Sequence, residues 1–185
     1  MLGVFLRSYL DIKSLHRIIK QQYNTMHSMN IPLHKLNYVF TKKPLLIGGM
    51  AMEYYNLRKS GTDIDLVADE LDVVALIKMY PDRVKNLYAD LGVCPFEFEI
   101  WRSINYFTYD DLKTNAIEEN DFFVISLEKL LIMKSLVMEE KKYRIDVSLI
   151  AHHIIDTQSK KSDQQKKDIE KLLINIDNIT YIEKR

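Results

Sequence analysis

The sequence holds few residues of the kinds that build disulfide frameworks or metal-thiolate sites. Its 185 residues include one cysteine, Cys94, which excludes a disulfide framework or a Cys-rich zinc site within one chain. This usage fits a reducing compartment, so we expect a cytoplasmic protein. Glycine is also scarce, at five residues, so two adjacent glycines need a specific explanation.

The sequence also has no excess of either charge and no long apolar run. Lys plus Arg and Asp plus Glu each number 26, which argues against a broad basic surface for nucleic acid, though a local patch is compatible. No run approaches the roughly 18 apolar residues of a membrane-spanning helix. The apolar start before Arg7 is too short for a signal peptide. We therefore expect no membrane partner.

Apolar residues make up 47% of the chain, enough for a buried core, and their spacing predicts an α+β protein. Strands are expected at residues 45–47, 62–68, 84–88, 96–101 and 122–125, with a turn around Gly92. Helices are expected at residues 10–28, 50–57, 70–80, 109–117, from 127 with Ser126 as its cap, 142–156 and 162–176.

The most informative stretch joins a glycine pair to a pair of aspartates. Gly48-Gly49 directly follows the first strand, where glycine lets the backbone turn sharply and lets a phosphate approach closely. The helix expected next would point its free N–H groups at the same place, which attracts anions. Thirteen residues later come Asp63 and Asp65, which a strand would project from one face. Paired carboxylates can hold Mg²⁺, which prefers oxygen ligands.

This combination resembles the DNA polymerase beta-like nucleotidyltransferase superfamily. The resemblance is clearest over residues 45–68 and extends more weakly to residues 96–101 and 125–150. Residues 125–134 resemble the helix after the sheet in small bacterial and phage-type members, which include toxin-like and antibiotic-modifying branches. The resemblance implies a small mixed β-sheet of the nucleotidyltransferase fold, flanked by helices. It also implies three carboxylates that bind two divalent ions and transfer of a nucleoside monophosphate from a triphosphate to an acceptor hydroxyl.

The resemblance implies a domain organisation too. We expect an N-terminal helical segment at residues 1–40, a nucleotidyltransferase core at residues 41–125 and a helical C-terminal part at residues 126–185 packed on the core.

The third carboxylate has two candidates, Glu97 and Glu99, which the expected strand would project from one face. We favour Glu99 because it lies in the middle of the apolar alternation, in an apolar-Glu-Ile context like that of small family members. Glu97 follows Pro95, which suits a strand start or edge. Asp63, Asp65 and Glu99 are thus the expected catalytic residues and the ligands of Mg²⁺ or Mn²⁺.

The resemblance also implies a binding site for the triphosphate. Gly48, Gly49 and Ser60 would hold the β- and γ-phosphates, and Arg58, Lys59 or Lys134 would offset their charge. A lysine on an apolar helix face more often extends to the surface, so this role of Lys134 stays open.

Two further features have plainer interpretations. Asp146 could pair with Lys134, but we favour a surface acid. Adjacent His152 and His153 diverge by about 100° on a helix, so they do not share an ion.

The acceptor is not apparent from the sequence: an RNA end, a protein or a small molecule would each fit. A different class of function is a non-catalytic nucleotide-binding or partner-binding module with the same fold. A third is a protein partner in a toxin–antitoxin or phage-defence pair.

Overall fold

The computed structural model describes residues 29–87 and 90–158. The chain divides into two compact units, residues 1–32 and 33–185, and every helix and strand described below belongs to the second. The helices expected at residues 10–28 and 162–176 lie outside the described residues. The domain limits expected at residues 40 and 125 stay predictions.

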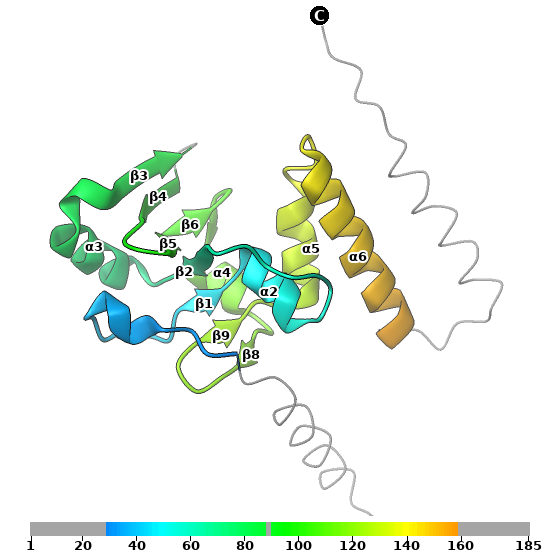
Figure 1. The fold of residues 1–185 in the computed structure, drawn as a ribbon, viewed down its shortest axis with the longest axis horizontal. Coiled ribbons are helices and arrows are strands. Elements are labelled where there is room, and N and C mark those ends of the chain that lie inside the picture. Colours follow the sequence, from blue (N-terminus) through cyan, green and yellow to red (C-terminus); the bar gives the residue numbers. More distant parts are fainter. Residues whose placement is uncertain (1–28, 88–89, 159–185) are drawn as a thin grey trace, which may run out of the picture. The chain divides into compact units, whose positions relative to one another are not determined.

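The second unit is built on a seven-stranded mixed sheet with the order β3-β4-β5-β2-β1-β9-β8 (Figure 1). Two neighbouring pairs are parallel, β2 with β5 and β1 with β9, and the others are antiparallel. The strands are β1 (Leu45–Leu46), β2 (Ile64–Val67), β3 (Val84–Leu87), β4 (Asp90–Val93), β5 (Phe98–Trp101), β8 (Ile117–Glu118) and β9 (Phe123–Val124). A separate two-stranded sheet is formed by β6 (Ser103–Ile104) and β7 (Phe107–Thr108).

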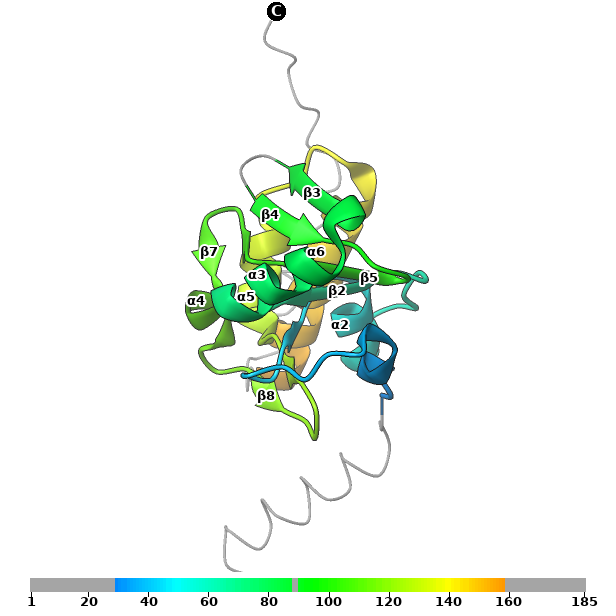
Figure 2. The same ribbon diagram turned by 90° about the vertical axis from the view of Figure 1, so that its left-hand side faces the viewer.

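Helices surround this sheet, so the expected α+β class is confirmed. The α-helices are α2 (Gly48–Tyr54), α3 (Glu70–Met79), α4 (Tyr109–Lys113), α5 (Leu127–Ser135) and α6 (Lys141–Gln158), with short 3₁₀ helices η1 (Leu33–Leu36) and η2 (Pro81–Arg83). Helix α2 lies against β2 in both views (Figure 1 and Figure 2), and α5 packs on α6. Ser126 caps α5 as expected, since its hydroxyl accepts a hydrogen bond from the Lys129 N–H.

The core lies between the sheet and its helices. The central strands supply fully buried side chains, among them Leu45, Leu46, Leu66 and Ile100. In the described residues no helix is long and apolar enough to cross a membrane.

The turn expected around Gly92 is wrong, because residues 90–93 form β4 between β3 and β5. Gly92 pairs with Trp101 of β5. A Cβ at Gly92 would lie 2.5 Å from Cε3 of Trp101 and 2.9 Å from the Ile100 carbonyl oxygen. The glycine is therefore needed because the Trp101 ring lies against the strand, not because the chain turns there.

Replacement of Gly92 by alanine should lower the free energy of unfolding by about 1–3 kcal/mol, as overpacking does in a filled core. Urea unfolding measures the difference. Gly61→Ala is the matched control, because its added Cβ would meet nothing within 4 Å. We expect the control to change stability by less than about 0.5 kcal/mol. Equal effects of both substitutions would contradict the packing of Trp101 against β4.

Candidate active site

Two carboxylates lie side by side on neighbouring parallel strands. Asp65 of β2 is the register partner of Glu99 of β5. Both side chains are half-buried, whereas their strand neighbours, such as Leu66 and Ile100, are fully buried. The alternation of a strand thus turns the apolar neighbours into the core and leaves the two acids together on the other face.

The glycine pair is built around Asp65. Gly48 begins α2 with φ of 65°, a left-handed conformation that favours glycine. A Cβ at Gly48 would also collide with the Asp65 carboxylate. The Gly49 N–H faces the Asp65 carboxylate closely enough to favour its ionised form. Helix α2 begins at Gly48, two residues earlier than expected.

Negative charge is crowded at Asp65. Burial raises its pKa, and the charges of Glu99 and Asp63 raise it further, to about 6. The charge of Lys134 and the Gly49 N–H act in the opposite direction without reversing the shift. A cation placed beside Asp65 and Glu99 would relieve this repulsion.

The other two candidate acids lie just outside the strands. Asp63 is exposed and precedes β2, which begins at Ile64. Glu97 precedes β5 and forms an ion pair with Lys35. The expectation that Glu97 and Glu99 share one strand is wrong, because residues 96 and 97 form a turn closed by a hydrogen bond from the Phe98 N–H to the Pro95 carbonyl. Phe96 in this turn has a left-handed φ of 56°.

Glu99 has a basic partner that the sequence analysis missed. Lys85 of β3 donates to the Glu99 carboxylate at 2.8 Å. Lys85 lies 14 residues before Glu99, on an edge strand whose side chains are all exposed, and nothing in its local sequence marks it as a partner of Glu99. The pairing of Lys85 with Glu99 could be predicted only if β4 were recognised as the strand between β3 and β5.

A buried ionic cluster joins α5 and α6 to the loop after α2. Asp146 is 1% exposed, so its expected place on the surface is wrong. Its carboxylate accepts from Arg58 Nε and Nη2, at 2.6 and 2.9 Å, and lies 3.1 Å from Lys134 Nζ. Burial opposes ionisation of Asp146, but the Arg58 bonds and the Lys134 charge outweigh it and hold its pKa below the usual value.

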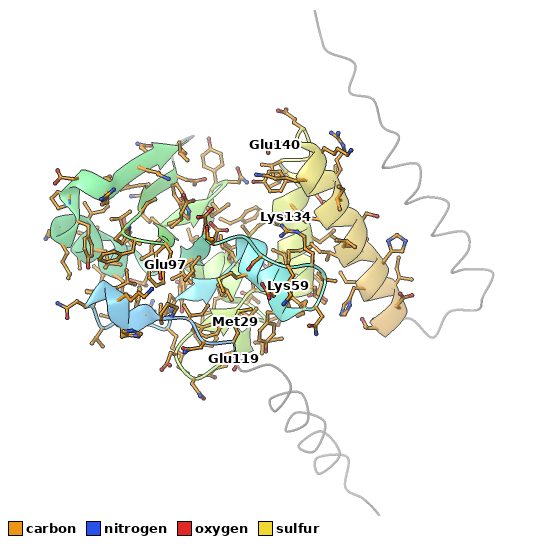
Figure 3. The ribbon with its side chains drawn as sticks, in the orientation of Figure 1. Met29, Lys59, Glu97, Glu119, Lys134 and Glu140 are labelled. Carbon is orange, nitrogen blue, oxygen red and sulfur yellow. The ribbon has the colours of Figure 1, made fainter. Side chains whose placement is uncertain are left out.

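Lys134 itself is buried, with its ammonium 4.7 Å from the centre of the Tyr143 ring. It does not extend to the surface, and Figure 3 shows it on α5. Arg58 and Lys134 therefore lie together, as expected, but both contact the buried carboxylate of Asp146. Two positive charges against one negative charge leave one positive charge in the cluster.

Glu53, an acid that the sequence analysis did not single out, holds the loop after α2 in place. Glu53 accepts hydrogen bonds from Ser60 N–H at 2.9 Å, Ser60 Oγ at 2.6 Å and Lys59 Nζ at 2.8 Å. The Lys59 and Ser60 bonds lower the pKa of Glu53 to about 2. A Cβ at Gly49 would lie 3.8 Å from both Arg58 Nη1 and Ser60 Cβ. Gly49, Arg58 and Ser60 thus gather in one place.

The donor set at Asp65 and Glu99 fits a hard divalent ion in chemistry, because both donors are carboxylate oxygens whose charges repel each other. Within residues 29–87 and 90–158, however, no three His, Cys, Asp or Glu side chains converge closely enough to hold a metal ion. Asp65 and Glu99, two of the three expected ligands, are therefore adjacent. The third, Asp63, is near enough to raise the pKa of Asp65 but lies outside the strand.

Comparison of the chain with models of protein families, with curated proteins and with solved structures gives no match. The resemblance to the nucleotidyltransferase superfamily therefore stays a prediction, and the geometry of the site is what supports a function.

Substitution of Asp65 by asparagine should stabilise the metal-free protein above pH 6. The raised pKa means that the folded state resists ionisation of Asp65, while the unfolded chain ionises it near pH 4. Asp65 therefore costs stability as the pH rises from about 4 to about 6, and the full cost persists above that window. We expect Asp65→Asn to raise the free energy of unfolding by about 1–3 kcal/mol at pH 7.5 and by almost nothing below pH 4.

Urea unfolding in the presence of a chelator measures this gain at the two pH values. Asp69→Asn serves as a control of opposite sign. A hydrogen bond from Lys42 lowers the pKa of Asp69, so its ionised form stabilises the fold. Loss of stability by Asp65→Asn at pH 7.5 would contradict the crowding of negative charge at the site.

Proposed function

We propose that the protein is a metal-dependent nucleotidyltransferase that moves a nucleoside monophosphate from a nucleoside triphosphate to an acceptor hydroxyl. The observation that carries the proposal is the register of β2 and β5, which sets Asp65 beside Glu99. The fit of Gly48 against Asp65 supports it, because it explains why the glycine pair and the aspartate occur together. On this proposal the α+β unit has the nucleotidyltransferase fold.

Asp65, Glu99 and Asp63 would hold Mg²⁺ or Mn²⁺, and the bound ion would neutralise charge on the reacting phosphate and activate the attacking hydroxyl. The chain's own residues keep these acids in place. Gly48 leaves room for the Asp65 carboxylate, and the pairing of β2 with β5 fixes the spacing of Asp65 and Glu99.

The triphosphate would lie near the residues that the loop after α2 brings to Gly49. Glu53 holds Ser60 and Lys59 in that loop. Arg58 and Lys134 share the Asp146 carboxylate, and their remaining positive charge would offset part of the charge of the phosphates. Lys134 is close enough to Asp65 to lower its pKa, so this charge acts on the same site.

We propose a discrete acceptor, namely an RNA end, a protein or a small molecule, rather than templated synthesis. The net charge of zero argues against the broad basic surface that favours a long nucleic acid.

The second candidate is a non-catalytic binding module with the same fold. One observation favours it: five expected functional groups already have protein partners. Glu99 is bonded to Lys85, Arg58 and Lys134 are bonded to Asp146, and Lys59 and Ser60 are bonded to Glu53. Such a module would bind a nucleotide or a partner protein without turnover.

The test is label transfer from each of the four α-labelled triphosphates, with Mg²⁺ or Mn²⁺, to the components of a cell extract. We expect one molecular species to be labelled. Glu99→Gln should reduce labelling by more than about 100-fold, since loss of even the outer partners of metal ligands costs roughly 10–100-fold.

Glu97→Gln is the matched control, because it removes the same charge two residues away, at an exposed pair with Lys35. We expect it to change labelling by less than about threefold, as the loss of an exposed ion pair has little effect. An inactive Glu97→Gln beside an active Glu99→Gln would move the site. Label on nothing, together with a triphosphate-dependent rise in melting temperature, would favour the non-catalytic module.

A further inference from the structure

Lys85 reaches Glu99 across an intervening strand. Lys85 pairs with Gly92 of β4, and Gly92 pairs with Trp101 of β5, so these three residues form a row across the sheet. Residues paired in such a row project from one face, and Glu99, two residues before Trp101, projects from the same face. Neighbouring strands lie about 4.8 Å apart. The Lys85–Glu99 pair joins β3 to β5 across β4, so it spans about 10 Å.

The Lys85–Glu99 pair crosses β4 at Gly92, which has no side chain. Trp101 is buried and its ring lies against Gly92, in the row that starts at Lys85. The Lys85 Nζ comes to 2.8 Å from Glu99 Oε1.

The Lys85 ammonium lies at the place where the two carboxylates of the site are adjacent. Glu99 is the register partner of Asp65, and its negative charge lies next to the Asp65 carboxylate. A lysine is charged at neutral pH, and the Lys85 Nζ forms an ion pair with the Glu99 carboxylate. In the metal-free protein the Lys85 ammonium thus acts as the cation of the Glu99 carboxylate, while Lys134 acts on Asp65.

We propose that Lys85 is a built-in competitor of the divalent ion: it neutralises Glu99 in the metal-free protein, and the ion must displace it from that carboxylate to bind. This proposal rests on the proposed metal site at Asp65 and Glu99, and it adds a regulation of that site. It explains why Glu99 is beside Asp65 and yet bonded to a lysine. Metal affinity would then be set by an edge strand that contributes no ligand.

The test is a titration of Mn²⁺ alone into the full chain, with free Mn²⁺ followed by electron paramagnetic resonance. Lys85→Met removes the ammonium and keeps most of the apolar stem, so the dissociation constant for Mn²⁺ should fall about fivefold, the scale of an exposed ion pair. Lys85→Gln should behave in the same way, and it provides a second variant if the methionine variant does not fold. Lys85→Arg keeps the charge and should bind Mn²⁺ within about twofold of the parent protein.

Lys35→Met is the matched control, because it breaks the corresponding pair between Lys35 and Glu97. We expect Mn²⁺ affinity to stay within about twofold of the parent. Equal or weaker Mn²⁺ binding by Lys85→Met and Lys85→Gln would overturn the competitor proposal while leaving the metal site intact. Absence of Mn²⁺ binding by the parent and by every variant would overturn the metal site itself, and the proposed function with it.

Discussion

The parallel pairing of β2 with β5 is the constraint on which the rest of the site depends. It sets Asp65 beside Glu99, although like charges at neighbouring positions of a sheet are destabilising. The surrounding residues compensate in separate ways. Gly48 leaves room for the Asp65 carboxylate, the Gly49 N–H favours its ionised form, and Lys85 forms an ion pair with Glu99. A structure that holds two carboxylates together at such a cost is typical of a cation site.

The buried cluster at Asp146 connects this site to the helical part of the chain. Arg58 comes from the loop after α2, Lys134 from α5 and Asp146 from α6, so one carboxylate joins three elements. Removal of one partner from a buried ion pair is strongly destabilising because it leaves an uncompensated charge. The same three residues therefore have two effects: they fix α5 and α6 to the loop, and they place a net positive charge near Asp65.

Local signals in the sequence predicted the helices and strands. The features that the sequence analysis missed depend on contacts between residues far apart in the chain. Apolar alternation and the Ser126 cap are read within a few residues, and both were confirmed. Gly92 was assigned to a turn because its true reason, the Trp101 ring on the next strand, is not local. Asp146 looked like a surface acid because Arg58 lies 88 residues away along the chain. Glu99 lies beside Asp65, as its central place in the strand predicted, while its role as a metal ligand stays a prediction. The Lys85 partner could be predicted only with β4 known.

The most direct measurement is the anomalous scattering of crystals grown with Mn²⁺ and a non-hydrolysable nucleoside triphosphate. The account predicts an Mn²⁺ peak within bonding distance, about 2.2 Å, of carboxylate oxygens from both Asp65 and Glu99. The same crystals should show Lys85 withdrawn from Glu99. A triphosphate bound elsewhere, or an Mn²⁺ peak with Glu99 still held by Lys85 and no contact to Asp65, would contradict the account.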